Sequence, residues 1–234
     1  MIAALLLVAA AVAPALRPDP CTHGADEPRP RVTRADQARA RRTIDAAVAE
    51  IDASADFRRL LLLVAQREAS LQPGAVHRLP ADVDAALAAW RRTRHLYVEA
   101  GNPHADDPDR WRGYGLFGMN SPYFLQVWDR AADPRVLCDA AIDVLVYRRA
   151  AARLLRRLSS ATCRAGQPVT WGDLHRAVAR GKLCGGASDD FRQRAVRVGL
   201  DPDAPVRAAD LGREPAGSQG AAAARIRIKA RSET

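Results

Sequence analysis

Residues 56–69 read DFRRLLLLVAQREA, and they predict the central helix of this protein. The middle of the stretch is apolar nearly all round the helix, because Leu60 to Leu63 are consecutive. A helix that is hydrophobic on every side is buried in the core of its domain. Pro73 and Gly74 end the helix soon after its last turn, which carries Glu68.

Further helices are predicted around this one from apolar residues at helical spacing, from Ser, Thr or Asp at N-terminal caps and from Pro at first helical positions. They span residues 35–54, 81–99, 135–158, 170–180 and 188–198, and a short one begins at Ser121-Pro122. Residues 101–113 are loop-like, and residues 114–119 form a short extended or turn-like segment. The expected fold class is therefore mainly α, with one small turn or β-like segment.

The composition is that of a globular protein, with 48% hydrophobic and 27% charged residues among 234. It excludes a disordered chain, a collagen-like fibre and a multi-span membrane protein. The formal net charge is +9, but Lys182 and Lys229 are the only lysines among 36 basic residues. This arginine bias and the 5% aromatic content argue against a nucleic-acid partner. A basic binding module stays open as the alternative class, with these arginines on two predicted helices: Arg91, Arg92, Arg94, Arg148, Arg149, Arg153, Arg156 and Arg157.

The first 15 residues predict a cleaved export signal. Residues 2–13 form an uncharged apolar run that is shorter than the roughly 20 residues of a membrane span. Ala13-Pro14-Ala15 has the small-x-small pattern of a signal-peptidase site. Residues 16–34 are rich in Pro, Arg and Asp and are expected to form a linker. The expected mature protein is periplasmic or secreted and has no integral membrane span.

Export makes the four cysteines candidates for disulfide bonds, for which three pairings are possible. Cys163 and Cys184 flank one predicted helix and are the preferred pair, which leaves Cys21 with Cys138. A structural zinc site is the competing interpretation, but the sequence has no CxxC and no histidine at ligand spacing. No HExxH motif is present either, so no metal is expected. Free buried thiols remain the alternative for a chain that is not exported.

Glu68 is the candidate catalytic residue on physical grounds. It ends an apolar helix just before a Pro-Gly break, so its side chain can project from the core toward a cleft. Partial burial and the negative end of the helix dipole both disfavour the anion and raise the pKa of its carboxyl group. A raised pKa suits a general acid that works near neutral pH. The alternative is a solvated glutamate beside Arg67 at a frayed helix end.

Residues 113–123 read GYGLFGMNSPY and supply a second candidate segment. The glycines formally fit GxGxxG, but no hydrophobic strand precedes them, so a dinucleotide site is rejected and no cofactor is expected. A glycine-spaced turn that carries aromatic and amide side chains suits the wall of a sugar-binding site. The predicted substrate-binding residues of this segment are Tyr114, Gly115, Met119, Asn120 and Tyr123.

Together the two segments resemble the lytic transglycosylase and goose-type lysozyme superfamily. In its motif a helix ends in Glu, with an apolar residue, Pro and Ala at offsets +3, +5 and +7. Here those positions hold Leu71, Pro73 and Ala75. GYGLFGMN falls where the family has a glycine-spaced turn, and Asp133-Pro134 before a long helix resembles the next landmark. The resemblance covers residues 56–158 and implies a lysozyme-like helical domain whose turn segment lines the cleft.

The resemblance also implies an activity, which is cleavage of the β-1,4 bond between N-acetylmuramic acid and N-acetylglucosamine in peptidoglycan strands, with Glu68 as the single general acid and base. A second carboxylate is needed if water is the acceptor; the acidic cluster Asp106, Asp107 and Asp109 supplies candidates. The chain departs from the family pattern at three positions. Ala69 stands in place of the usual Ser, but Ser70 is next to it and is therefore also a predicted substrate-binding residue. Gly118 stands in place of the usual Gln, and Leu137 in place of an Asn that often follows the Asp-Pro. A lysozyme-like protein that binds glycan with weak or no cleavage is therefore the alternative.

The family's Ala-Tyr-Asn segment is missing downstream, so the sequence does not identify the tyrosine that usually faces the glutamate. The expected domain organisation is a signal peptide (1–15), a linker (16–34), a lysozyme-like domain (35–160), a helical C-terminal extension (161–211) and a disordered tail (212–234).

Overall fold

The computed structural model describes residues 21, 30–164, 166–217 and 219–232. The predicted signal peptide and most of the predicted linker lie outside these residues. The described part of the chain contains eight α-helices and one two-stranded antiparallel hairpin, which confirms a mainly α fold class. The helices are α1 (Arg34–Ile51), α2 (Ala55–Ala69), α3 (Pro80–Glu99), α4 (Ser121–Phe124), α5 (Ala140–Ser159), α6 (Trp171–Arg180), α7 (Asp189–Arg197) and α8 (Gln219–Ser232). The strands are β1 (Gly113–Tyr114) and β2 (Met119–Asn120).

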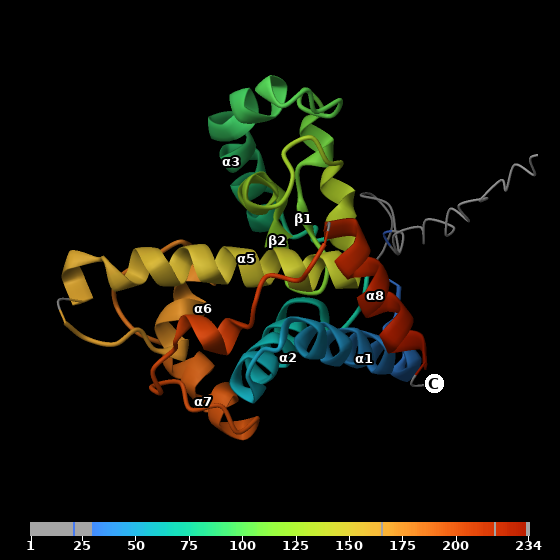
Figure 1. Ribbon diagram of the computed structural model, residues 1–234. Coiled ribbons are helices and arrows are strands. Elements are labelled where there is room, and N and C mark those ends of the chain that lie inside the picture. Colours follow the sequence, from blue (N-terminus) through green and yellow to red (C-terminus); the bar gives the residue numbers. More distant parts are fainter. Residues whose placement is uncertain (1–20, 22–29, 165, 218, 233–234) are drawn as a thin grey trace, which may run out of the picture.

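Helix α5 crosses the middle of the molecule and divides it into two parts (Figure 1). Helices α1 and α2 lie on one side of α5, while α3 and the β1–β2 hairpin lie on the other. Helices α6 and α7 cover the ends of α5 and α2, and α8 lies along α1. This arrangement places the end of α2 and the hairpin close to the same stretch of α5.

The prediction that residues 56–69 form a core helix is confirmed. Phe57, Leu60, Leu61 and Ala65 of α2 are fully buried. The ring of Phe57 lies against Tyr147 of α5, with 6.4 Å between ring centroids. Burial of each large apolar side chain contributes about 1.5–3 kcal/mol, so α2 is held mainly by its packing.

Local capping signals fix most helix starts as predicted. Ser54 caps α2 by accepting a hydrogen bond from the backbone N–H of Phe57. Thr170 and Asp173 form the expected capping box at the start of α6. The helix predicted over 135–158 differs, because residues 134–138 form a 3₁₀ turn and α5 begins only at Ala140. Asp139 causes this break: its backbone is extended, and its side chain accepts from two amides of the first turn of α5.

The C-terminal segment differs from the expected disordered tail. Residues 219–232 form α8, which packs on α1 and α5. Ala222, Ala223 and Ile226 are fully buried, and their spacing places them on one helix face. Glu50 of α1 accepts hydrogen bonds from Arg225 at 2.7 Å and from Lys229 at 2.9 Å. The tail therefore completes the core.

Both predicted disulfide bonds are present. Cys163 pairs with Cys184, and Cys21 pairs with Cys138 at the end of the 3₁₀ turn before α5. The second bond ties the N-terminal region to the middle of the protein. Two disulfides indicate an oxidising, extracytoplasmic environment. Within the described ranges, every helix is too short or too polar to cross a membrane.

Candidate functional site

A cleft of about 800 Å³ runs between the two parts of the molecule. Its lining comes from the end of α2, from α3, from the hairpin and α4, and from α5 and α6. Glu68 and Asn120 both line it, so the structure brings together the two segments that the sequence singled out. The side chain of Glu68 therefore faces the same hollow as the glycine hairpin.

Backbone hydrogen bonds connect the hairpin to the segment that follows α2. Gly115 N–H donates to the carbonyl of Ala75 at 2.8 Å, and His77 N–H donates to the carbonyl of Gly113 at 2.9 Å. Val76 and Tyr114 form an antiparallel bridge between these bonds. The residues at and after offset +7 from Glu68 thus act as a third short strand beside β1, and this pairing fixes the position of the hairpin relative to the end of α2.

Gly115 and Gly118 of the turn are each required for a different steric reason. Gly115 has φ +81°, and a Cβ at this position would collide with the carboxylate of Asp143 and the carbonyl of Leu137. Gly118 has φ +59°, and its Cβ would lie 2.7 Å from the ring of His77. Both glycines are needed for the close approach of the hairpin to its supports.

Asp143 of α5 supports the hairpin through a backbone hydrogen bond. It is fully buried and accepts a hydrogen bond from the backbone N–H of Phe117 at 3.3 Å. Burial raises the pKa of its carboxyl group well above the ordinary value. The hydrogen bonds from the amides of Leu116 and Phe117 act in the opposite direction, and the nearby Asp139 adds to the rise.

Glu68 is in the second-last position of α2, and its side chain is 35% exposed. Burial is the largest cause that raises the pKa of its carboxyl group. The guanidinium of Arg67, 3.6 Å away, lowers the pKa, whereas the negative charge of Asp82 raises it again. The net shift is upward. A larger fraction of Glu68 is therefore protonated near neutral pH than for an ordinary glutamate.

Tyr147 of α5 is a site residue that the sequence analysis missed. Its side chain lines the cleft and is only 1% exposed. Burial raises the pKa of its phenol, and the negative charge of Glu68 raises it further, so the two groups are close enough to interact. The hydroxyl has no hydrogen-bond partner among the described residues. Phe117 of the hairpin packs on its ring, with 4.8 Å between centroids. Tyr147 is therefore a protonated donor at the wall of the cleft.

The predicted substrate-binding residues fall into two groups. Met119, Asn120 and Tyr123 line the cleft, and the exposed Tyr123 accepts a hydrogen bond from Arg92 at 2.7 Å. Ser70, Tyr114 and Gly115 do not line it. Ser70 is the C-cap of α2 with φ 54°, and its carbonyl accepts from Gln37 of α1.

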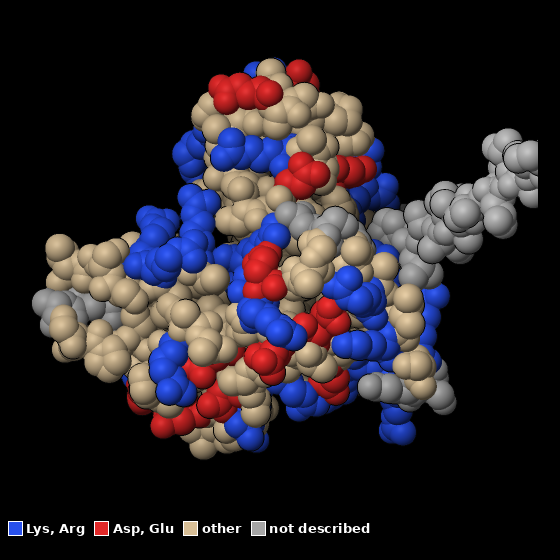
Figure 2. Space-filling model, viewed as in Figure 1, with Lys and Arg blue, Asp and Glu red and all other residues tan. Residues whose placement is uncertain are grey.

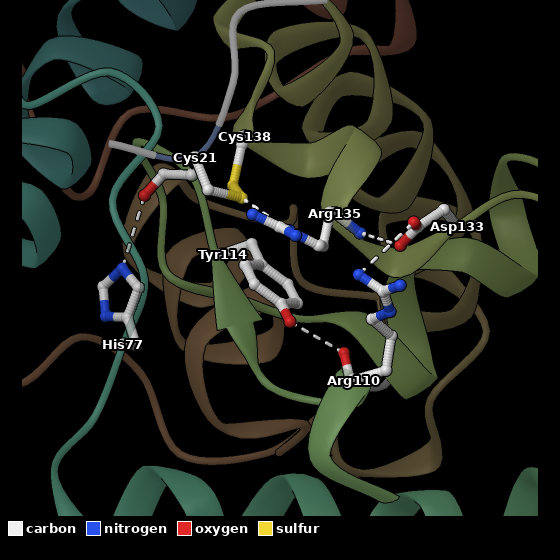
Figure 3. The surroundings of a disulfide bond; sticks show 8 residues. Cys21, His77, Arg110, Tyr114, Asp133, Arg135 and Cys138 are labelled. Carbon is white, nitrogen blue, oxygen red and sulfur yellow. Dashed lines mark hydrogen bonds and ion pairs between the residues drawn. A yellow bond between two sulfur atoms is a disulfide. The ribbon is translucent and has the colours of Figure 1, made fainter. Parts of the chain in front are cut away.

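Tyr114 lies beside the Cys21–Cys138 disulfide (Figure 3). Its hydroxyl donates to the carbonyl of Arg110 at 2.8 Å, and burial raises its pKa to about 12. The ring supports the hairpin from the disulfide side. In the hairpin, Gly113 pairs with Asn120 and Tyr114 pairs with Met119. Successive strand residues point to opposite faces, so Tyr114 and Asn120 lie on opposite faces of the hairpin, and of the two only Asn120 lines the cleft.

The acidic loop predicted as a source of second carboxylates lies apart from the cleft lining. Asp106 pairs with Arg94, Asp107 with Arg110, and Asp109 with Arg112. In the part of the chain that the structure describes, Asp82 of α3 is instead the acidic residue that shares the lining with Glu68. No local sequence pattern indicates Asp82, because only the tertiary fold brings α3 and the end of α2 to the same cleft.

Among the described residues, no three His, Cys, Asp or Glu side chains lie together as metal ligands would. Comparison of the chain with models of known protein families, with curated proteins and with solved structures found no match.

Proposed function

We propose that the protein is a peptidoglycan-cleaving glycosidase of the lytic transglycosylase type, with Glu68 as general acid and base. One observation carries this proposal: the half-buried carboxyl of Glu68 and the glycine hairpin line one cleft, and residues 75–77, which follow α2, pair with the hairpin through backbone hydrogen bonds. The lysozyme-like motif resemblance over residues 56–158 supplies the substrate class. The cleft is large enough for several sugar units, since ligand sites have volumes of about 300–1,000 Å³.

In the proposed reaction, protonated Glu68 donates its proton to the glycosidic oxygen while the bond between that oxygen and C1 of N-acetylmuramic acid breaks. The sugar develops positive charge at C1, which the resulting carboxylate of Glu68 stabilises. The carboxylate then removes the proton from the C6 hydroxyl as its oxygen attacks C1. A 1,6-anhydro ring forms, Glu68 is protonated again and no water is consumed.

Tyr147 is suited to hold the reacting group in place. Its hydroxyl stays protonated and has no partner among the described residues, so it can donate a hydrogen bond to a bound sugar. The side-chain oxygen of Asn120 is likewise buried without a partner in the described structure. An unmet polar group costs about 1–3 kcal/mol, and a bound glycan that met both groups would recover this cost.

Hydrolysis is the second candidate reaction, and the position of Asp82 in the cleft supports it. Asp82 lines the cleft and raises the pKa of Glu68 through its charge. A carboxylate on the second side of the bond could activate water. The two reactions leave different products, since hydrolysis adds one water that ring closure does not.

The test is mass analysis of the products from purified cell-wall sacculi. We expect the wild-type protein to release muropeptides that end in 1,6-anhydro-N-acetylmuramic acid. Products heavier by one water would assign hydrolysis in place of ring closure, and loss of those products in Asp82→Asn would then assign the base role to Asp82. Binding to sacculi without any released muropeptide would refute the proposed cleavage and favour the glycan-binding alternative.

The activity should depend on pH through Glu68. The acid must be protonated to act, so kcat/KM falls as pH rises through the pKa of Glu68, which burial places above that of an ordinary glutamate. Arg67→Gln removes a cation that lowers this pKa and should move the alkaline limb to higher pH. Asp82→Asn removes an anion that raises it and should move the limb to lower pH. Profiles measured on soluble glycan strands check both directions; a limb that shifts the same way in both variants would contradict the assignment.

A further inference from the structure

One end of the cleft is lined by arginines that have no acidic partner within the described part of the chain. Arg153 and Arg157 of α5 and Arg180 at the end of α6 all line it. Among the residues that the structure describes, none of these three has a carboxylate oxygen within 4.0 Å. By contrast, Arg148 and Arg149 of the same helix both pair with Glu214. Figure 2 shows Lys and Arg side chains on both sides of the hollow between α3 and α5.

Arg153 and Arg157 lie on the same face of α5 as Tyr147. Residues 147, 150, 153, 154 and 157 of α5 line the cleft at helical spacing. At a rise of 1.5 Å per residue, Arg153 and Arg157 lie about 9 and 15 Å along the helix axis from Tyr147. Two arginines at positions i and i+4 repel each other, and in the described structure no protein carboxylate relieves this repulsion. The arrangement therefore favours an external anion.

His175 of α6 supplies an independent observation in the same cleft, near Arg180. It lines the cleft, is only 6% exposed, and its Nδ1 atom has no hydrogen-bond partner among the described residues. Its ring stacks on Phe191, with 4.2 Å between centroids. Burial lowers the pKa of His175 to about 4, and the charges of Arg67 and Arg180 act in the same direction, against a weaker effect of Asp190. The imidazole is thus neutral near pH 7, and its Nδ1 atom is available for a hydrogen bond to a polar group of a ligand in the cleft.

We propose that this end of the cleft is a subsite for the carboxylates of the peptide stems on the glycan strand, bound by Arg153 and Arg157 with Arg180 at the rim. The inference rests on the proposed function, because the peptide is attached to the muramic acid next to the bond that is cleaved. Arginine binds carboxylates through paired hydrogen bonds, and like charges in a concave site concentrate the attraction for an anion. The subsite gives the enzyme a preference for strands that still carry peptides.

The test separates binding from cleavage by using a Glu68→Gln background. The affinity of the Glu68→Gln protein is measured for purified glycan strands with their stem peptides and for the same strands after an amidase has removed the peptides. We expect the background protein to prefer peptide-bearing strands about tenfold, as expected for one or two charge-assisted hydrogen bonds. Adding Arg153→Gln and Arg157→Gln should abolish the preference and leave the affinity for stripped strands unchanged.

The matched control adds Arg41→Gln and Arg197→Gln, which remove the same charge from exposed positions on α1 and α7, outside the cleft lining. This control should keep the preference. An equal loss in the control would show that only diffuse charge acts, and would overturn the subsite. A preference lost only when phosphate-linked wall polymers are removed would overturn the carboxylate assignment in favour of phosphate. Stronger competition by duplex DNA than by peptide-bearing strands would overturn it in favour of a nucleic acid.

Failure of this inference and failure of the proposed function remain distinguishable. Muropeptide release by the wild-type protein, with no preference in the Glu68→Gln background, would refute the subsite alone. A preference without any release by the wild type would refute the cleavage and leave the subsite as part of a glycan-binding protein.

Discussion

Glu68→Gln should lower the turnover on purified sacculi by about 100-fold or more, the contribution expected from a general acid. Glutamine keeps the size of the side chain and its hydrogen-bonding capacity but cannot donate a proton to the leaving oxygen. The half-buried carboxyl has a raised pKa, so a neutral amide suits its surroundings at least as well. We therefore expect the fold and the affinity for glycan strands to be kept while the released muropeptides disappear.

The matched control is Glu99→Gln, which makes the same substitution at the exposed end of α3. Its turnover should equal that of the wild type, and both variants should unfold at the wild-type temperature. If Glu68→Gln kept wild-type turnover, Glu68 would not be the acid, and the proposed function would lose its central residue. A lower turnover in both variants would indicate that the loss of any negative charge, and not the loss of the acid, reduces activity.

Gly115→Ala should lower the free energy of unfolding by about 4 kcal/mol, a loss that marks a steric or buried-network defect. The new Cβ would occupy the space of the Asp143 carboxylate and the Leu137 carbonyl, and the backbone has φ +81°. Neither obstacle is a flexible side-chain end, because Asp143 is fully buried and the carbonyl is backbone. The hairpin must therefore move away from α5, and muropeptide release should fall with it.

The control variant Gly101→Ala separates the cost of the positive φ from the cost of the steric collision. Gly101 also has positive φ, +69°, but an added Cβ would meet nothing within 4 Å. It should cost only about 1 kcal/mol for the left-handed backbone. Denaturant unfolding of both variants measures the difference, which is the cost of the collision. Equal losses would show that the hairpin can shift freely, and that its position does not depend on Asp143.

The helices could be predicted because their signals are local. Caps such as Ser54 and the Thr170–Asp173 pair act within four residues, and the apolar run of α2 identifies a core helix without knowledge of its partners. The same holds for the motif at Glu68, where Ala75 proves to be the residue that pairs with the hairpin. Here the sequence spacing reflects a direct hydrogen bond.

The missed site residues depend on contacts between distant segments. In the sequence, Tyr147 is one more apolar position of an amphipathic helix, and only its placement between Phe57 and Phe117 makes it part of the cleft. Asp82 and His175 enter the site because the tertiary fold brings α3 and α6 to the cleft that the end of α2 and α5 also line. Ser70 was expected in the site because it is next to Ala69, where the resembled motif has a serine, but two consecutive residues with positive φ, Ser70 and Leu71, turn the chain at the end of α2, and Ser70 does not line the cleft.

The expected disorder after residue 212 came from low sequence complexity. The signal that could have corrected it is the spacing of Ala222, Ala223, Ile226 and Ala230, which is that of a helix with one buried face. Alanine provides little hydrophobic contrast against arginine-rich surroundings. The partner face on α1 is also remote in the sequence, so its presence could not be inferred.

The packing of α8 on α1 has a consequence for biogenesis. Glu50 and Lys229, which are in contact, lie 179 residues apart in the chain. Contacts of such high sequence separation form late and slow folding, because a long loop must close first. During synthesis from the N-terminus, the side of α1 that α8 covers stays open to solvent until residues 219–232 have been made. Until then the apolar face of α1 lacks its partner helix, and it is a surface that a chaperone could bind.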